Sequence, residues 1–483
     1  MIVALALSAA VSAAFGALAL LRAWPSAEAP GSRPLVAALG IGLGAGLSSL
    51  LLFAWLILLG PTREFPLLEA ALLALLAFAT YRTRRRPGLG TGLGGWLVGP
   101  ARLLTPLFLL ALLAAAAAFM TMLRQEPHGQ WDAWMNWDMR ARMIFLGGPA
   151  WRTAFAPELP WSHPDYPVLV PSLVVRAWLY AGKSTLLGPA LVAATFAFAA
   201  VALLVTALGA LRAPSQGLLA GMVLLATPFF IRHATSLYAD VPLAFFFLAT
   251  VVCLALDDRA RETTSRFAVL AGFSAGLAMW TKNEGLLFTG CVLVGIVATG
   301  RRSGWAETRR RLVHVGAGLL LPLLVVVSFK LTLAPPNDLL STLGIERTLG
   351  RLTDPARYGA VVRAYALQLV TFGANGLPGA VWPLAAFAVA LGWHPVERRR
   401  LWARAVGIAL GLLLAGHFMV FVSMADELAR LLASSLERLI LQLWPSALFL
   451  GFMVTRTLEE LGETRPAEPV RTGPAAFHRE GAS

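Results

Sequence analysis

Long apolar runs follow one another from residue 1 to about residue 456, and short polar stretches separate them. Many of the runs are close to 20 residues long, the length with which an α-helix crosses a hydrocarbon core of about 30 Å. This pattern predicts an all-α polytopic membrane protein. We predict about thirteen spans from run length and loop charge, at residues 1–21, 35–60, 66–81, 101–123, 185–209, 217–232, 238–256, 266–280, 285–299, 312–334, 376–392, 404–424 and 438–456.

The composition removes several other classes of protein. Hydrophobic residues make up 58% of the 483 residues and charged residues 14%, and the mean hydropathy of +0.70 excludes a soluble enzyme. The net charge of +14 comes from arginines that cluster in short loops, so it indicates topology and no nucleic-acid partner. Both cysteines, Cys253 and Cys291, lie in apolar runs, which excludes a disulfide framework and a cysteine metal cluster.

Three basic loops, at residues 82–86, 301–311 and 398–404, set the expected orientation. If all three face the cytoplasm, the N-terminus lies outside and the C-terminus inside. Five segments then share the extracytoplasmic side, namely 124–184, 233–240, 281–284, 334–375 and 425–437. Most of the unusual polar residues fall in these segments.

Other parts of the chain need separate interpretations. Residues 1–21 have no charged start and no cleavage site, which favours a retained helix over a signal peptide. The apolar piece 168–180 would break the alternation of sides if it spanned, so we expect a juxtamembrane or re-entrant helix. The tail, 457–483, lacks periodicity and is expected to be cytoplasmic and disordered. No internal repeat of the kind that transporters carry is visible.

The first outer segment contains Trp131-Asp132-Ala133-Trp134-Met135-Asn136-Trp137-Asp138. At helical spacing Trp131, Trp134 and Trp137 or Asp138 share one side, while Asp132 lies with Asn136 on another. Asp138 has Arg142 four residues later and is expected to form a surface ion pair with it. Asp132 has no such partner, so it either caps the helix or acts as a general base. The tryptophans belong either to an interfacial aromatic belt or to a sugar-stacking surface.

Further along, His163, Asp165 and Tyr166 stand in a turn between two prolines. His163 and Asp165 could bind a divalent cation or orient an acceptor, but two ligands are a weak metal signal, and a purely structural turn is the alternative. A cofactor therefore does not follow from the residues, and a metal stays open.

Three later segments carry charges at expected helix ends. Asp240 lies in the first turn of a span and either caps it or adjoins a site. Lys282 and Glu284 form a tight hairpin, in which they neutralise each other or Lys282 meets a phosphate. Arg438 opens the last span and either binds phosphate through its planar fork or anchors the helix at the interface, paired with Glu437.

Taken in order, these segments resemble the GT-C superfamily of membrane glycosyltransferases, in particular its protein O-mannosyltransferase and aminoarabinose transferase branch. An early loop aspartate is matched by Asp132, and a proline-bounded segment before juxtamembrane helices by residues 163–169. The later matches are Asp240-Val241-Pro242, Gly276-Leu277-Ala278-Met279-Trp280-Thr281-Lys282 and Arg438-Leu439-Ile440-Leu441-Gln442-Leu443-Trp444-Pro445. The family places its large loop after the first span, whereas about three additional spans precede the loop here.

The resemblance implies a fold and an activity. Residues 101–456 would form a GT-C-like catalytic module with outer loops at 124–184 and 334–375, and residues 1–100 would add helices without an assigned role. The enzyme would sit in a bacterial inner membrane and act in cell-envelope glycan biosynthesis. It would move a hexose or pentose from a polyprenyl-phosphate donor to a glycan, lipid or protein acceptor.

In that scheme Asp132 is the catalytic base and Arg438 or Lys282 stabilises the phosphate leaving group. The expected substrate-binding residues are Trp131, Trp134, Asn136, His163, Asp165, Tyr166, Asp240, Lys282, Glu284 and Arg438. The alternative function is a transporter or flippase of lipid-linked or amphipathic substrates, which predicts charges at mid-membrane depth and paired repeats.

Overall fold

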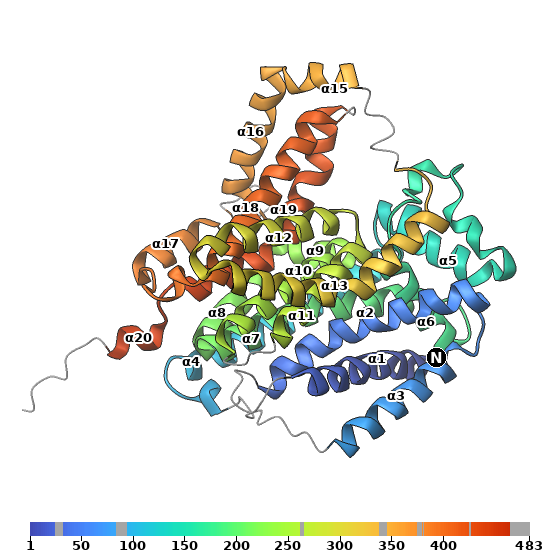
Figure 1. Cartoon of the computed structure of the whole chain (residues 1–483), viewed down its shortest axis with the longest axis horizontal. Helices are drawn as coiled ribbons and strands as arrows, with labels where there is room; N and C mark the ends of the chain where they lie inside the picture. The colour runs from blue at the N-terminus through green and yellow to red at the C-terminus, as the bar shows by residue number, and fades with distance from the viewer. Residues whose placement is uncertain are drawn as a thin grey trace, which may run out of the picture.

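The computed structural model describes residues 1–24, 32–83, 94–260, 265–337, 345–373, 379, 381–424 and 427–463. Every element in these ranges is a helix (Figure 1). The elements are α1 (Ile2–Ala23), α2 (Arg33–Leu59), α3 (Phe65–Arg82), η1 (Gly94–Leu97), α4 (Ala101–Gln125), η2 (Ala133–Trp137), α5 (Asp138–Leu146), η3 (Gly148–Phe155), η4 (Pro160–Ser162), α6 (Leu169–Ala181), α7 (Leu187–Leu211), α8 (Pro214–Leu225), α9 (Pro228–Thr235), α10 (Asp240–Arg259), α11 (Arg266–Thr281), α12 (Glu284–Ser303), α13 (Trp305–Thr332), α15 (Ile345–Leu352), α16 (Pro355–Thr371), α17 (Val381–Leu391), η5 (Glu397–Arg399), α18 (Leu401–Ser423), α19 (Leu428–Val454) and α20 (Leu458–Glu463).

Nine helices of the described ranges are long and apolar enough to cross a membrane, which confirms a polytopic α-helical protein but not thirteen spans. Two of the predicted spans, α11 and α17, have only 16 and 11 residues, and the apolar part of α12 ends at Gly300. The predicted span 217–232 is instead α8 and α9, which are bent by 62°. Thr227 is extended at this bend because it precedes Pro228, and proline disfavours a helical residue before it.

Helix α10 is the centre of the bundle and is buried along its whole apolar length. It packs against α7, α11 and α19, and its side chains Phe245, Phe246 and Phe247 are completely buried. Since Asp240 is the first residue of this helix, the central packing also fixes the position of that carboxylate.

A smaller helical cluster projects from the bundle, where α15 and α16 lie beside the ends of α18 and α19 (Figure 1). Arg357 of α16 donates hydrogen bonds of 2.9 to 3.1 Å to carbonyl groups at the end of α18, namely those of Phe421 and Val422 in the helix and of Met424 directly after it. These carbonyls have no partner within their own helix, so the guanidinium satisfies them. The predicted outer loop 334–375 therefore carries two helices.

Two further expectations are corrected in the C-terminal part. Helix α19 begins at Leu428, so residues 428–437 are helical rather than loop, and Arg438 lies inside the helix instead of opening it. The predicted disordered tail 457–483 begins with the short helix α20, Leu458–Glu463, and residues 464–483 lie outside the described residues.

Helices α1 and α2 pack with their backbones in close contact. The facing residues are small and recur every four positions, with Ser8, Ser12 and Gly16 on α1 and Gly40, Gly44 and Ser48 on α2. A Cβ atom on Gly44 would lie 1.9 Å from the carbonyl oxygen of Ser12. Small residues at this spacing let membrane helices approach closely, so van der Waals contact holds the pair together.

We expect Gly44→Ala to destabilise the protein, because the new methyl group forces α1 and α2 apart. The loss should be about 1–3 kcal/mol, as for overpacked cores. Thermal unfolding in one detergent measures it, with Gly411→Ala as the control, since a Cβ at Gly411 meets nothing within 4 Å. Equal melting temperatures for the two variants would contradict the close contact.

Candidate functional site

The carboxylate of Asp240 is the centre of a buried polar cluster. It is completely buried and accepts hydrogen bonds from four side chains. His233 Nε2 and Lys282 Nζ each lie 3.1 Å away, Gln442 Nε2 lies 2.6 Å away, and Arg438 Nη2 lies 3.0 Å away. The predicted alternative of a simple helix cap is wrong, since this side chain makes no capping bond.

Four helices bring these groups together. The bend after α8 turns α9 so that His233, near its end, faces Asp240, while Phe229 stacks on the imidazole at 5.0 Å. Lys282 is the residue directly after α11. Arg438 and Gln442 are one turn apart on α19 and therefore share a face of that helix.

Arg438 connects the buried cluster to a carboxylate at the surface. Its Nη2 donates to Asp132 Oδ2 at 2.7 Å as well as to Asp240, and its guanidinium lies 4.6 Å from the ring centroid of Tyr238. The side chain of Asp132 is 30% exposed and makes no capping bond, so the alternative that it caps the helix is wrong. The bonds of Arg438 use Nε and Nη2, and within the described ranges Nη1 has no partner.

The hairpin between α11 and α12 carries the second cation of the site. Lys282 Nζ lies 2.7 Å from Glu284 Oε1 and 5.9 Å from the ring centroid of Tyr166. Burial alone would lower the pKa of Lys282, but the charges of Asp240 and Glu284 outweigh it and raise the pKa. Lys282 is therefore a permanent cation. Its position is compatible with both predicted alternatives, pairing with Glu284 and contact with a phosphate.

Asn283, the middle residue of the hairpin, belongs to a second polar cluster around Asp165. Asp165 is 1% exposed, and its Oδ2 accepts from Asn283 Nδ2 at 2.9 Å and from Asn337 Nδ2 at 2.6 Å. Lys330 Nζ donates to the backbone oxygen of Asp165 and to Asn283 Oδ1 at 3.0 Å. The hairpin thus joins the two carboxylate clusters.

Tyr166 lies between the two clusters. Its ring stacks on His163 with centroids 5.1 Å apart and on Trp137 with centroids 5.9 Å apart. Burial raises the pKa of Tyr166 well above its ordinary value, and the nearby charges of Glu284 and Asp165 add to the effect. The hydroxyl therefore stays protonated and can donate a hydrogen bond.

The expectation that Trp131 and Trp134 share one side with Trp137 or Asp138 is wrong, because both Trp137 and Asp138 are buried. Trp131 and Trp134 are exposed and pack edge to face at 4.9 Å, whereas Trp137 is buried against Tyr166. The cause is a π-helical turn over residues 133–137, whose wider hydrogen-bonding pattern changes the direction of later side chains. Asn136 is also buried, and in the described part of the chain no hydrogen bond joins it to Asp132 or Asp240.

The surface ion pair expected for Asp138 is also absent from the described residues. Asp138 is 7% exposed while Arg142 is exposed, and the two do not form an ion pair. Burial raises the pKa of Asp138 to about 7, and the charge of Arg142 only partly opposes it.

Six residues that contribute to these clusters were not among the predicted site residues: His233, Tyr238, Asn283, Lys330, Asn337 and Gln442. Gln442 follows Arg438 by one helical turn, which is a signal that the sequence contains. Lys330 and Asn337 carry no comparable signal, because only folding places them beside Asp165.

A metal site has little support in this geometry. Among the described residues, groups of three or more His, Cys, Asp or Glu side chains that could hold a metal ion do not occur. The two residues considered as ligands have other contacts, since His163 stacks on Tyr166 and Asp165 binds two amides.

The chain matches no protein-family model, no curated protein and no solved structure. The class of the protein is therefore described from its fold and its site alone. It is a polytopic α-helical membrane protein with a buried carboxylate cluster, which a single arginine connects to a partly exposed aspartate.

We expect Asp138→Asn to stabilise the folded protein at high pH only. The folded carboxyl keeps its proton up to pH 7, whereas the unfolded one loses it near pH 4, so wild-type stability falls as the pH rises from 4 to 7. The variant lacks this loss and should be more stable by roughly 1–3 kcal/mol at pH 8. Unfolding measured at pH 4 and pH 8 checks this. An equal effect at both pH values would rule out the buried neutral carboxyl.

Proposed function

We propose that this protein is an integral membrane glycosyltransferase of the GT-C type. It transfers a sugar from a polyprenyl-phosphate donor to a glycan, lipid or protein acceptor on the extracytoplasmic side. The observation that carries the proposal is the contact of Arg438 with both Asp132 and Asp240. This contact places a partly exposed carboxylate beside a cation whose Nη1 has no partner among the residues that the structure describes.

The proposed reaction uses these groups in one displacement. Asp132 takes the proton of an acceptor hydroxyl while the hydroxyl oxygen attacks the anomeric carbon. The bond between that carbon and the phosphate oxygen breaks, and the electron pair leaves with the polyprenyl phosphate. Arg438 and Lys282 stabilise the negative charge that develops there.

The buried carboxylate of Asp240 has a supporting role in this scheme. It binds Arg438 and Lys282 through different oxygens, so both cations are held in place before a donor arrives. Preorganised charges of this kind need no rearrangement during the reaction, which makes them effective in catalysis.

The aromatic residues fit a carbohydrate substrate. Trp131 and Trp134 are 59% and 48% exposed and adjoin Asp132 in sequence, so their faces are available to a sugar ring. Tyr166 offers a hydroxyl that stays protonated between the two clusters.

One observation favours transport as the second candidate. The chain bends between α8 and α9, and α9 carries His233 to the site. Broken helices of this kind form substrate sites in transporters. A transporter would move a lipid-linked sugar without breaking its glycosidic bond. Product analysis of the purified protein with polyprenyl-phosphate-linked hexoses and pentoses distinguishes the two functions.

We expect Asp132→Asn to abolish transfer, with at least a hundredfold loss of kcat, since general bases contribute about that much or more. The carboxamide keeps the size of the side chain, so the protein should unfold at nearly the wild-type temperature. Glu158→Gln is the control, because Glu158 is an exposed carboxylate of the same loop. Wild-type activity of Asp132→Asn would remove this residue as the base.

Arg438→Lys should recover only part of the activity that Arg438→Ala loses. A lysine presents a point charge and cannot bond to Asp132, Asp240 and a phosphate with one planar fork. Steady-state kinetics with varied donor concentration measure the effect as a fall in kcat, a rise in the KM for the donor, or both. If both variants keep wild-type donor kinetics, the phosphate site does not include Arg438.

A further inference from the structure

Helix α6 begins three residues after Tyr166, so its position sets the position of the site loop. It has 13 residues, or about 20 Å of helix, which is too short to cross a bilayer. All of its residues from Leu169 to Leu179 are nevertheless buried, including the charged Arg176. A short buried helix with a charge inside it needs specific partners.

Arg176 finds its partner on α3. Its Nε lies 2.9 Å from both carboxylate oxygens of Glu69, and its Nη2 lies 2.8 Å from Oε2. The side chain of Glu69 is completely buried and that of Arg176 is 3% exposed. Tyr180 donates to the same carboxylate at 2.8 Å, and Arg176 Nη1 donates to Ser8 of α1 at 2.7 Å.

A second polar contact joins α6 to α2. The hydroxyl groups of Ser172 and Ser49 lie 2.6 Å apart, and Trp280 Nε1 of α11 donates to Ser49 at 2.9 Å. All three N-terminal helices therefore hold α6 through polar groups, and the contact through Trp280 leads back to α11, the helix that directly precedes Lys282.

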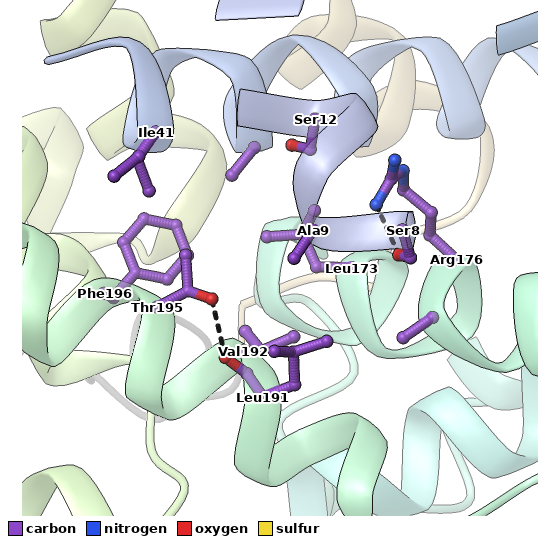
Figure 2. A pocket seen from close by; sticks show the side chains of 12 residues that line it. Ser8, Ala9, Ser12, Ile41, Leu173, Arg176, Leu191, Val192, Thr195 and Phe196 are labelled. Carbon is purple, nitrogen blue, oxygen red and sulfur yellow. Dashed lines mark hydrogen bonds between the residues drawn. The ribbon is translucent and has the colours of Figure 1, made fainter. Parts of the chain in front are cut away.

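A small cavity borders α6 beside this ion pair. It has a volume of about 40 Å³ and lies between α1, α2, α6 and α7, and its lining includes Ser8, Ser12, Leu173, Arg176 and Thr195 (Figure 2). Arg176 and Ser8 both line this cavity, and the hydrogen bond between them joins α6 to α1 there.

We propose that Glu69 and Arg176 are positioning residues, through which the first three helices hold α6 and with it the loop that carries Asp165 and Tyr166. This gives α1, α2 and α3 a role in the site. The inference rests on the proposed function only in assuming that the loop with Asp165 and Tyr166 belongs to the transferase site.

The test measures the loop directly in the full-length protein. Cys253 and Cys291 are replaced by alanine, and Ser162→Cys places a thiol at a completely buried loop position. We expect Glu69→Gln to speed maleimide labelling of this thiol about tenfold, because the unpaired Arg176 charge displaces α6. Ser49→Ala, which removes only a hydroxyl, should give a smaller increase.

The matched control is Glu397→Gln. Glu397 is also a buried carboxylate, and it pairs with Arg259 at 2.8 Å, far along the chain from the site loop. Faster labelling with Glu69→Gln and unchanged labelling with Glu397→Gln supports the proposal. Equal labelling in both variants overturns it, even if Glu69→Gln lowers the melting temperature. If Glu69→Gln does not fold, Ser49→Ala takes its place. Faster labelling with Ser49→Ala than with Glu397→Gln then supports the proposal, and equal labelling overturns it.

A transfer assay on the same proteins separates this inference from the proposed function. If labelling responds as expected but the wild type cleaves no lipid-linked sugar, the positioning role stands and the transferase proposal fails. If transfer occurs and Glu69→Gln leaves kcat, donor KM and labelling at wild-type values, the transferase stands and the positioning role fails.

Discussion

The buried carboxylate of Asp240 imposes the main constraint on this structure. A charge removed from water inside a membrane bundle costs several kcal/mol unless charged and polar partners surround it. Four side chains from three other helices meet this requirement, and two of them are cations. Because displacement of α9, α11 or α19 would remove at least one of these partners, the cluster also fixes how these helices meet at the site.

The sequence predicted the long helices well because their signal is local. Runs such as α7 and α18 are apolar over their whole length, so composition alone identifies them. It also placed Asp132, Asp240, Lys282 and Arg438 in the site, and the structure joins them in one chain of ion pairs. Their mutual contacts were not predictable, since Arg438 and Asp240 are 198 positions apart and only packing decides their distance.

The predictions were wrong where they relied on local residue spacing and the packing of the folded protein decided the outcome. Asp138 and Arg142 have the spacing of a surface pair, but burial of the helix face removes Asp138 from its neighbour. The 3.6-residue period failed for Trp137 because the segment is a π-helical turn, which no apolar pattern announces. Likewise the apolar run at 217–232 predicted one continuous span, although Pro228 breaks it into α8 and α9.

The close contact of α1 with α2 has a consequence for how the chain assembles. Both helices leave the ribosome before the site loop exists, and their small facing residues allow them to pair without any later segment. In the folded protein Arg176 of α6 binds Ser8 of this pair and Glu69 of the neighbouring α3. Because α1 and α3 precede α6 in the chain, both partners of Arg176 are synthesised before the arginine itself.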